Sequence, residues 1–471
     1  MQALWHQYGE IATVLAYLLS STIAIAHLLV FKSNSVSAAA WLVFVLVMPF
    51  AGPLLYWLFG INRIQGDATA LRGMRWSDQG AVPGTIVPHL EGERGLVRVG
   101  RVVSGAEMAS GHTVELLING ERAFPAMLGA IDGARSEVLL TTYIFDDDDT
   151  GQRFVSALAR ARERGVQVLV LLDDLGRRTS APGILPALLR ANLTVLRFMP
   201  MQLIPPKFSV NLRNHRKLLI VDQTQGFAGG MNIGDRQLLS GDVTRRAADI
   251  HFEFGGPVVA DMRELFVSDW QRCGGSDPGP LQALPVAQGA AACRLIADGP
   301  DERLDHLVLL LIGVIAAAQR RVVILTPYFL PDRRLLGALQ SAALRGVRVQ
   351  VLIPERCNWP FVRWALNHTV WDLLMTGVEV LEQPGTFAHS KCLLIDDDYA
   401  LVGSANLDPR SLRLNFELAI EIVDSAFSAQ LHAYVEPLLE CSRRLSLQAL
   451  SQRSLPSRLR DAAAALFAPY L

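Results

Sequence analysis

The hydrophobic pattern separates an uncharged N-terminal region from a longer region in which short apolar runs alternate with polar segments. Residues 11–31 contain no charged side chain, and neither do residues 38–59. Because an α-helix rises about 1.5 Å per residue, either stretch is long enough to cross about 30 Å of hydrocarbon. We therefore predict that residues 1–62 form a hairpin of two transmembrane helices.

The charges beside the two stretches predict the orientation of this hairpin. Lys32 is the one basic residue between them, whereas Arg63, Arg72 and Arg75 follow the second stretch. The positive-inside rule then places the rest of the chain, and the N-terminus as well, in the cytoplasm. A cleaved signal peptide is disfavoured because the first ten residues contain no Lys or Arg. Two buried core helices are the remaining alternative, and uncharged runs this long are rare in soluble cores.

The rest of the chain has the alternation of an α/β protein. Residues 63–105 mix Gly, Pro and charged residues and are predicted to be a linker. Beyond them, strand-like apolar runs alternate with helical patterns. Two series of strand, helix and strand stand out, first at residues 138–144, 154–164 and 166–172, and then at residues 321–326, 335–344 and 347–353.

Single residues in and near the two series also recur in the same order and at similar spacings. Tyr143 corresponds to Tyr328, and His215, further along the chain, corresponds to His389. This predicts a duplicated domain, with one site shared across a pseudo-two-fold axis, rather than a solenoid of short repeats. The predicted units are a first domain at residues 106–285, a second domain at residues 286–430 and a C-terminal helical segment at residues 431–471.

Composition narrows the class of function. The chain has 44 Lys and Arg against 45 Asp and Glu, a net charge of -1, so it offers no global attraction to nucleic acid or to anionic lipid, and a local basic patch is left open. It is 51% hydrophobic, which fits a membrane region. None of the five cysteines has zinc spacing, and their odd number favours a reduced, cytoplasmic body.

Two copies of one polar motif carry the candidate chemistry. Each has a Lys two residues after a His, an Asp seven residues after it and an Asn seventeen residues after it. The fifteenth residue after the His is Gly in the first copy and Ser in the second. The first copy comprises His215, Lys217, Asp222, Gly230 and Asn232, and the second comprises His389, Lys391, Asp396, Ser404 and Asn406. Two copies with identical spacing are a strong signal.

This set of residues fits the chemistry of a phosphodiester. Lys and Asn supply N–H donors that can surround a phosphate, and the segments of Gly230 and Ser404 let the backbone approach it. One His can attack phosphorus, while the other protonates the leaving alcohol and later deprotonates the acceptor. Such a reaction needs no metal and no cofactor.

Four carboxylates complete the candidate site. Each reactive His needs an acid that orients its second ring nitrogen. Asp249, which follows the first motif, and Glu417, which follows the second, are the predicted orienting acids. Asp222 and Asp396 follow apolar strands, where a carboxylate can accept hydrogen bonds from turn amides. For these two, a structural role is favoured over a catalytic one.

Several segments resemble the bacterial cardiolipin synthases of the phospholipase D superfamily. The resemblance implies tandem α/β/α domains with two transmembrane helices in the bacterial cytoplasmic membrane. It also implies two phosphatidylglycerol substrates, cardiolipin and glycerol as products, and a phosphatidyl-histidine intermediate on His215 with His389 as acid and base. The similar segments are Asn211–Lys217, Gly229–Asp235, Thr326–Phe329, Asn406–Ser411 and Leu414–Glu417.

Some positions depart from that family, and several questions stay open. Ala247 stands where the synthases usually have Trp, which leaves phosphatidylethanolamine or another alcohol as an alternative acceptor. Hydrolysis by water is a second alternative. A non-catalytic scaffold is disfavoured because it would need neither His. The segment from Ser454 carries Arg458 and Arg460 beside Leu459, and either lies on the membrane as an amphipathic helix or packs on the catalytic body. A homo-oligomer is left open.

Overall fold

The computed structural model describes residues 2–32, 35–60, 94–178, 183–200, 202–203, 206–207, 212–240, 246–281, 286–300 and 305–468. The chain divides between Leu71 and Arg72 into two compact units. Most of the expected linker lies outside the described residues, but its end forms helix α5, Gly95–Ser104.

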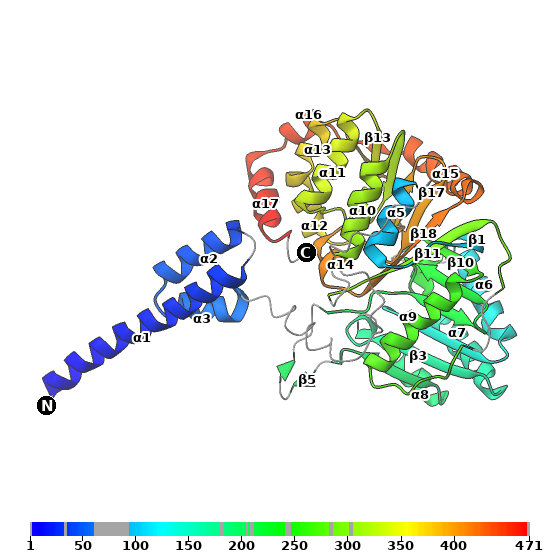
Figure 1. Cartoon of the computed structure of the whole chain (residues 1–471), viewed down its shortest axis with the longest axis horizontal. Coiled ribbons are helices and arrows are strands. Elements are labelled where there is room, and N and C mark those ends of the chain that lie inside the picture. The colour runs from blue at the N-terminus through cyan, green and yellow to red at the C-terminus, as the bar shows by residue number, and fades with distance from the viewer. Residues whose placement is uncertain are drawn as a thin grey trace. The chain divides into compact units, whose positions relative to one another are not determined.

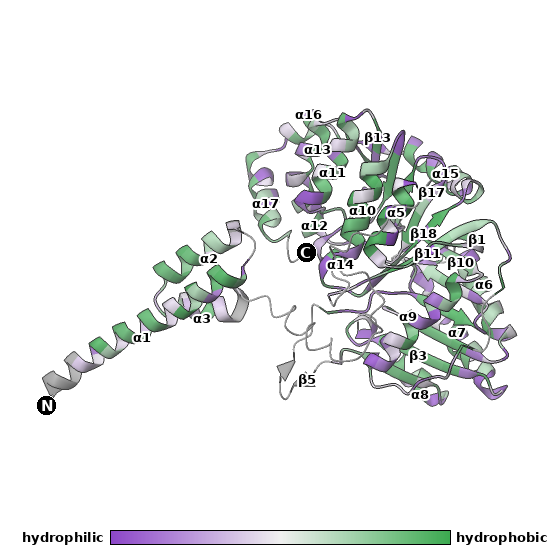
Figure 2. Cartoon of the chain, viewed as in Figure 1, coloured by the Kyte–Doolittle hydropathy of each residue, from purple (hydrophilic) through white to green (hydrophobic). Residues whose placement is uncertain are grey.

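The N-terminal unit is a helical hairpin. Helix α1 covers Gln2–Phe31, and its part Tyr8–Phe31 is the one described helix that is long and apolar enough to cross a membrane. Helix α2 (Ser35–Val47), helix α3 (Ala51–Leu55) and a π-helical turn η1 (Tyr56–Gly60) follow. Figure 2 shows that α1 and α2 are mainly hydrophobic. The two arms contact each other, since the Tyr17 hydroxyl donates to the Leu46 carbonyl at 2.9 Å.

The second expected membrane helix, residues 38–59, is not continuous. The chain leaves α2 at Val47 and turns through Pro49 and Phe50 before α3 begins. Proline has no N–H to donate to the preceding turn, and Phe50 has a positive φ of 56°. At Gly52, a Cβ atom would lie 2.6 Å from the carbonyl oxygen of Phe44, so this return needs glycine. The prediction of one unbroken helix was therefore wrong in this respect.

The C-terminal unit is built on one sheet of fifteen strands. The order is β4-β3-β2-β7-β8-β10-β1 in the first half, then β11-β18-β17-β16-β12-β13-β14-β19 in the second. Apart from β19, each half repeats the other outward from the antiparallel pair β1 and β11. Figure 1 shows the two halves joined side by side. The repeat confirms the predicted duplication of an α/β domain.

The strand bounds are as follows. In the first half they are β1 Ala109–Ile118, β2 Glu137–Thr142, β3 Gln167–Asp173, β4 Thr194–Phe198, β7 Leu218–Val221, β8 Gln225–Gly229 and β10 Ile250–Gly255. In the second half they are β11 Ala291–Asp298, β12 Arg321–Leu325, β13 Arg348–Pro354, β14 Glu379–Gln383, β16 Cys392–Ile395, β17 Tyr399–Gly403, β18 Glu417–Val423 and β19 Arg443–Arg444. Two short pairs stand outside the sheet, namely β5 Gln202–Leu203 with β6 Pro206–Lys207, and β9 Ala247–Ala248 with β15 Phe387–Ala388.

Helices cover both faces of the sheet. One face packs on α9 (Val258–Arg272) and α15 (Ser425–Glu440), which share one hydrophobic core. The other face has two cores, one for each half. The helices of that face are α6 Asn119–Gly133, α7 Asp149–Glu163, α8 Leu185–Arg190, α10 His306–Ala317, α11 Arg333–Leu344, α12 Pro360–Thr369 and α13 Trp371–Met375. The remaining segments are η2 Gly176–Arg178, η3 Asp235–Gln237, α14 Pro409–Arg413, α16 Leu447–Ser451 and α17 Leu455–Leu466.

The apolar pattern explains these three layers. Strand β7 is buried at every residue, and its side chains alternate between the two faces. Leu218 and Ile220 join the core under α9, whereas Leu219 and Val221 join the core under α6 and α7. The fold class predicted from the sequence, a tandem α/β/α arrangement, is thus confirmed. The boundary expected at residue 430 falls inside α15, so the C-terminal segment begins after Glu440.

Candidate active site

The two histidine segments cross between the halves of the sheet. His215 lies just before β7, and its N–H donates to the carbonyl of Phe416, in the other half, at 2.9 Å. His389 lies between β15 and β16, and its N–H donates to the carbonyl of Ala248 at 2.7 Å. Strand β15 also pairs in parallel with β9, which precedes Asp249. Each histidine segment is therefore held by the segment that carries the acid of the other half.

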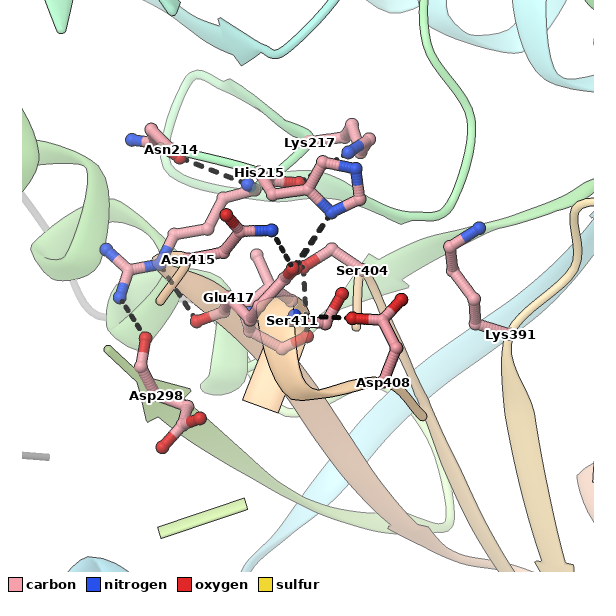
Figure 3. Close-up of polar contacts among 12 residues, drawn as sticks. Asn214, His215, Lys217, Asp298, Lys391, Ser404, Asp408, Ser411, Asn415 and Glu417 are labelled. Atoms are coloured by element: carbon pink, nitrogen blue, oxygen red, sulfur yellow. Dashed lines mark hydrogen bonds and ion pairs between the residues drawn. The ribbon is translucent and has the colours of Figure 1, made fainter. Parts of the chain in front are cut away.

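The side chains follow the same crossing. His215 Nδ1 lies 2.9 Å from Glu417 Oε1, and His389 Nδ1 lies 2.7 Å from Asp249 Oδ2. Figure 3 shows the His215 ring directed at Glu417. Sequence order had placed Asp249 after His215 and Glu417 after His389, whereas the structure pairs each acid with the histidine of the opposite half. Both imidazoles consequently belong to one shared site.

Glu417 is the more extensively bonded of the two acids. The Ser404 hydroxyl donates to its Oε2 at 2.5 Å, and Asn415 Nδ2 donates to Oε1 at 3.1 Å. Burial alone would raise the pKa of Glu417, but His215, Lys217 and the Ser404 hydroxyl lower the pKa to about 2. Ser404 was expected to bind phosphate, yet it is fully buried and its hydroxyl is used by Glu417. We assign it to positioning this acid instead.

Asp249 has different surroundings. Its Oδ1 accepts from the backbone N–H of Ile250 at 2.8 Å. Gly230 occupies the position that corresponds to Ser404. A Cβ atom at Gly230 would lie 2.9 Å from Asp249 Oδ1 and 3.2 Å from Lys391 Cδ. The missing side chain therefore allows Asp249 and Lys391 to approach the motif closely.

The two lysines bring positive charge into the buried site. Burial lowers the pKa of Lys217 to about 7 and that of Lys391 to about 8. Burial also lowers the pKa of both imidazoles, that of His389 to about 4, so each ring is neutral near pH 7. Lys391 Nζ lies 3.1 Å from each ring nitrogen of His389. The site thus combines neutral imidazoles with cations that an anionic substrate would stabilise.

The motif asparagines are also buried. Asn232 Oδ1 accepts from the backbone N–H of Ile144 at 3.1 Å, which fixes the amide and leaves its NH₂ group available to donate. Asn406 Oδ1 has no hydrogen-bond partner among the described residues. The side chain of Asn406 is hydrogen-bonded to Asp408. Binding of a phosphate oxygen by either asparagine stays a prediction.

Asp222 and Asp396 lie away from the imidazoles, beyond the far ends of β7 and β16. Each has a positive φ, 49° and 53° respectively. Each accepts three backbone N–H groups, those of residues 135–137 for Asp222 and those of residues 319–321 for Asp396. They hold a strand end to the neighbouring turn, so we propose a structural role and no part in the chemistry.

One important contact was missed in the sequence. Arg216, between the motif His and Lys, is fully buried and forms an ion pair with Asp269 at 2.6 Å. Its Nε donates to the carbonyl of Glu417 at 2.9 Å, and its Nη2 donates to the carbonyl of Asp298 at 3.0 Å. It therefore joins the first motif to β18 and β11. An arginine next to an apolar buried strand was the available signal, because a buried cation requires a partner.

Comparison with known families agrees with this geometry. Residues 127–270 and 311–439 match the family model described as "Cardiolipin synthase, PLD-like domain". Residues 20–60 match the one described as "Phospholipase_D-nuclease N-terminal". The chain belongs to the PLD-like cardiolipin synthase family.

Relatives within this family cover almost the whole chain. Cardiolipin synthase A of Pseudomonas aeruginosa (strain LESB58) is 34% identical over 429 residues, which are 88% of this chain and 86% of that protein. The major cardiolipin synthase of Bacillus subtilis (strain 168) is 30% identical over 474 residues, 95% of this chain and 97% of that protein. The crystal structure of phosphatidylserine synthase from Haemophilus influenzae Rd KW20 has the same fold, with a TM-score of 0.59 and 16% identity over 76% of this chain and 95% of that one.

Proposed function

We propose that this chain is a membrane-bound cardiolipin synthase that transfers a phosphatidyl group from one phosphatidylglycerol to another and releases glycerol. The observation that carries the proposal is the pair of imidazoles in one buried site, each with a carboxylate on Nδ1 and a lysine two residues further on. Membership of the cardiolipin synthase family supports the choice of lipid substrate.

In the first step, His215 Nε2 attacks the phosphorus of one phosphatidylglycerol. A phosphorus–nitrogen bond forms, the bond from phosphorus to the glycerol headgroup oxygen breaks, and His389 gives its Nε2 proton to that oxygen. His389 must therefore be protonated when the lipid is bound. The negative phosphodiester favours this because it offsets the charge of Lys391, which together with burial lowers the pKa of His389 in the free protein.

In the second step, His389 removes the proton from a headgroup hydroxyl of a second phosphatidylglycerol. The new alkoxide oxygen bonds to phosphorus, the phosphorus–nitrogen bond breaks, and His215 is restored. Lys217 and Lys391, with the amides of Asn232 and Asn406, would stabilise the charge on the phosphoryl oxygens in both steps.

The surroundings of Glu417 support His215 as the nucleophile. A phosphorylated imidazole carries positive charge and keeps its Nδ1 proton, so its partner must stay ionised. The low pKa of Glu417 and its two side-chain donors provide such a partner. Asp249 accepts a hydrogen bond from the backbone N–H of Ile250. We propose that it is suited to a histidine that gains and loses a proton.

Helix α1 supports attachment to the bilayer that contains both substrates. We infer that the C-terminal unit lies on the cytoplasmic side and that the chain crosses the membrane twice, because Arg63, Arg72 and Arg75 follow the hairpin while Lys32 alone lies at its turn. Labelling of single introduced cysteines in intact cells would test this orientation, and labelling of the C-terminal unit by an impermeant reagent from outside would contradict it.

The direct test is an assay of the purified full chain in phosphatidylglycerol vesicles, with cardiolipin, glycerol and phosphatidic acid followed together. We expect cardiolipin and glycerol in equal amounts, and neither product from the His215→Ala variant. Phosphatidic acid without cardiolipin would contradict the synthase proposal, since water would then resolve the intermediate. Addition of phosphatidylethanolamine would distinguish a different acceptor from true hydrolysis.

A further inference from the structure

Exposed apolar side chains gather on one part of the C-terminal unit. Among its described residues, fourteen large apolar side chains are exposed, and eight of these lie on or directly beside α12, α13 and α17. The eight include all four aromatic side chains that are exposed in the described part of this unit. We call the surface formed by α12, α17 and their flanking residues the α12–α17 face. Its members are Trp359, Phe361, Leu455, Leu459, Leu466 and Phe467.

Helix α17 has two different sides. Asp461 and Ala464 are buried on the side that packs against α12. Leu455, Leu459 and Leu466 follow one another at four and seven residues on the other side, with 66%, 62% and 78% of their surfaces exposed. The two alternatives for this segment are thus compatible, because the helix packs on the body and still presents an apolar stripe outward.

The aromatic residues of α12 continue this stripe. The ring of Phe361 lies 5.0 Å from that of Trp364. Arg460 follows Leu459 on α17, and its guanidinium carbon lies 4.5 Å from the centre of the Trp364 ring. Trp359, exposed over 61% of its surface, immediately precedes α12. One continuous surface therefore joins the two helices.

This surface reaches the edge of the active site. Asn358, next to Trp359, accepts a hydrogen bond from the Tyr328 hydroxyl at 2.6 Å. The Tyr328 ring lies 6.4 Å from that of Phe387, and Phe387 lies 5.9 Å from the His389 ring. The segment that begins the α12–α17 face is therefore linked to His389 through the contacts of Tyr328 and Phe387.

The charge of the C-terminal segment complements an anionic surface. Residues 441–468 contain five arginines and a single acid, Asp461. Two of the arginines form ion pairs with Glu379 and Glu382 of β14. Even when both glutamates are counted, the segment keeps an excess of two positive charges. Basic residues beside exposed Leu, Trp and Phe are typical of helices that lie in the headgroup region of an anionic bilayer.

We propose that the α12–α17 face docks on the anionic lipid surface and so turns the active site toward its phosphatidylglycerol substrates. The inference rests on the proposed function for the identity of the lipid. Charge excess, exposed aromatic residues and position beside the site together select a bilayer over an apolar protein partner, which would not need the arginines. The N-terminal helix α1 would hold the chain in the membrane, and this face would set the orientation of the C-terminal unit.

The first test compares the full-length double variant Leu455→Glu/Leu459→Glu with Leu344→Glu, which changes a leucine of α11 that is 74% exposed. Cardiolipin formation is measured on phosphatidylglycerol vesicles and on short-chain phosphatidylglycerol dissolved as monomers. We expect the double variant to lose about tenfold on vesicles, because charged side chains oppose burial in the interface, and to keep its rate on monomers. The control should match the wild type on both substrates. A double variant with wild-type rates on vesicles would overturn the proposal.

A second measurement uses the unaltered full chain, so it does not depend on variants that fold. Vesicles that contain a photoreactive phosphatidylglycerol are irradiated, and the cross-linked peptides are identified. We expect adducts at residues 454–468 and 357–364 in addition to residues 2–60. Adducts confined to residues 2–60, or cross-links from Leu459 to α1 or to a second copy of the chain, would overturn docking on lipid. If wild-type protein makes no cardiolipin from phosphatidylglycerol vesicles, the proposed function fails, and the cross-links still decide the docking.

Discussion

The two halves of the C-terminal unit share one backbone arrangement but differ in how they hold the reactive imidazole. Glu417, the acid on His215, accepts from the side chains of Ser404 and Asn415. Asp249, the acid on the other imidazole, accepts from a backbone amide, and Gly230 replaces the serine. The duplication has therefore kept the motif and changed the surroundings of the acid. This difference is the basis of the unequal roles that we propose for two histidines whose motifs look alike.

A second difference lies between the motif His and Lys. The first half has Arg216, which forms a buried ion pair and bonds two carbonyls of the second half. The second half has Ser390 at that position. The half that carries His215 is thus joined to its neighbour by charged hydrogen bonds, whereas the half that carries His389 is joined mainly by backbone pairing.

The largest expected effect separates the two histidines. His215→Ala and His389→Ala should each lower turnover by about 10⁴-fold or more, because residues that act together in covalent catalysis fail together. Only His389→Ala should accumulate a phosphatidyl-enzyme. It should form slowly, because the first step lacks its acid, and it should persist, because the nucleophile is intact and the second step lacks a base. Mass spectrometry of protein that is denatured and kept at alkaline pH after incubation with phosphatidylglycerol measures this, because the phosphorus–nitrogen bond hydrolyses in acid. Accumulation in His215→Ala alone would reverse the assignment.

Replacement of each orienting acid by its amide is expected to have the next largest effect on turnover. Glu417→Gln should lower kcat by about 10³-fold with little change in KM, because a neutral amide neither fixes the tautomer nor stabilises a positive imidazole. Asp249→Asn should cost less, about 10²-fold, if its histidine only exchanges protons. Steady-state kinetics on vesicles measure both. Asp222→Asn is the matched control, and it should lower the melting temperature while the folded protein keeps its kcat. Equal losses for the two acids would remove the proposed division of roles.

Much of this site follows from the sequence, and the reasons differ from residue to residue. The relative position of His215 and Lys217 can be predicted locally, because residues two apart on an extended segment point to the same face. The sequence singled out Asp249 and Glu417 as the orienting acids. Which histidine each acid contacts depends on which half of the sheet supplies the segment beside that histidine. That contact joins His215 in the first half to Phe416 near the end of the second, and no local pattern encodes it.

Two expectations depend on features that composition does not encode: the direction of a side chain and a break in a helix. A serine near a phosphate motif is expected to bind phosphate; this role stays a prediction, and the structure shows the Ser404 hydroxyl directed at Glu417. The second membrane segment is apolar throughout, so composition predicts a helix, but the missing N–H of Pro49 and the tight return at Gly52 divide it. In that segment the geometry of two residues outweighs a pattern that is correct on average.

Removal of Arg216 should break the link that is specific to the first half. Arg216→Met leaves Asp269 buried without its cation, which should lower the free energy of unfolding by about 3–5 kcal/mol. The double variant Arg216→Met/Asp269→Leu should recover most of this loss because no charge is left buried. Thermal unfolding of the purified full chain in detergent measures the effect. A single variant as stable as the wild type would show that the pair does not stabilise the first motif.

The lysines predict a pH dependence of smaller size. Since burial lowers the pKa of Lys217 to about 7 and that of Lys391 to about 8, the free protein loses these cations as pH rises through that range. Binding of the phosphodiester needs the cations, so kcat/KM should fall by about tenfold per pH unit once one lysine is deprotonated. In Lys217→Arg the guanidinium stays protonated, so the fall near pH 7 should disappear even if the overall rate is lower. A wild-type kcat/KM that stays constant up to pH 9 would contradict the buried cations.

The smallest expected effect tests the origin of the asymmetry directly. Ser404→Ala removes one charge-assisted donor from Glu417, and such a hydrogen bond contributes about 1.5–3 kcal/mol, so kcat should fall by roughly tenfold or somewhat more. Because the acid then holds positive charge on His215 less firmly, the phosphatidyl-enzyme trapped in His389→Ala should form more slowly. The matched control is Ser428→Ala, whose hydroxyl on α15 is buried and has no partner in the described part of the chain. If Ser404→Ala behaves like this control, the low pKa of Glu417 arises from the cations alone, and the two halves differ less than their hydrogen bonds indicate.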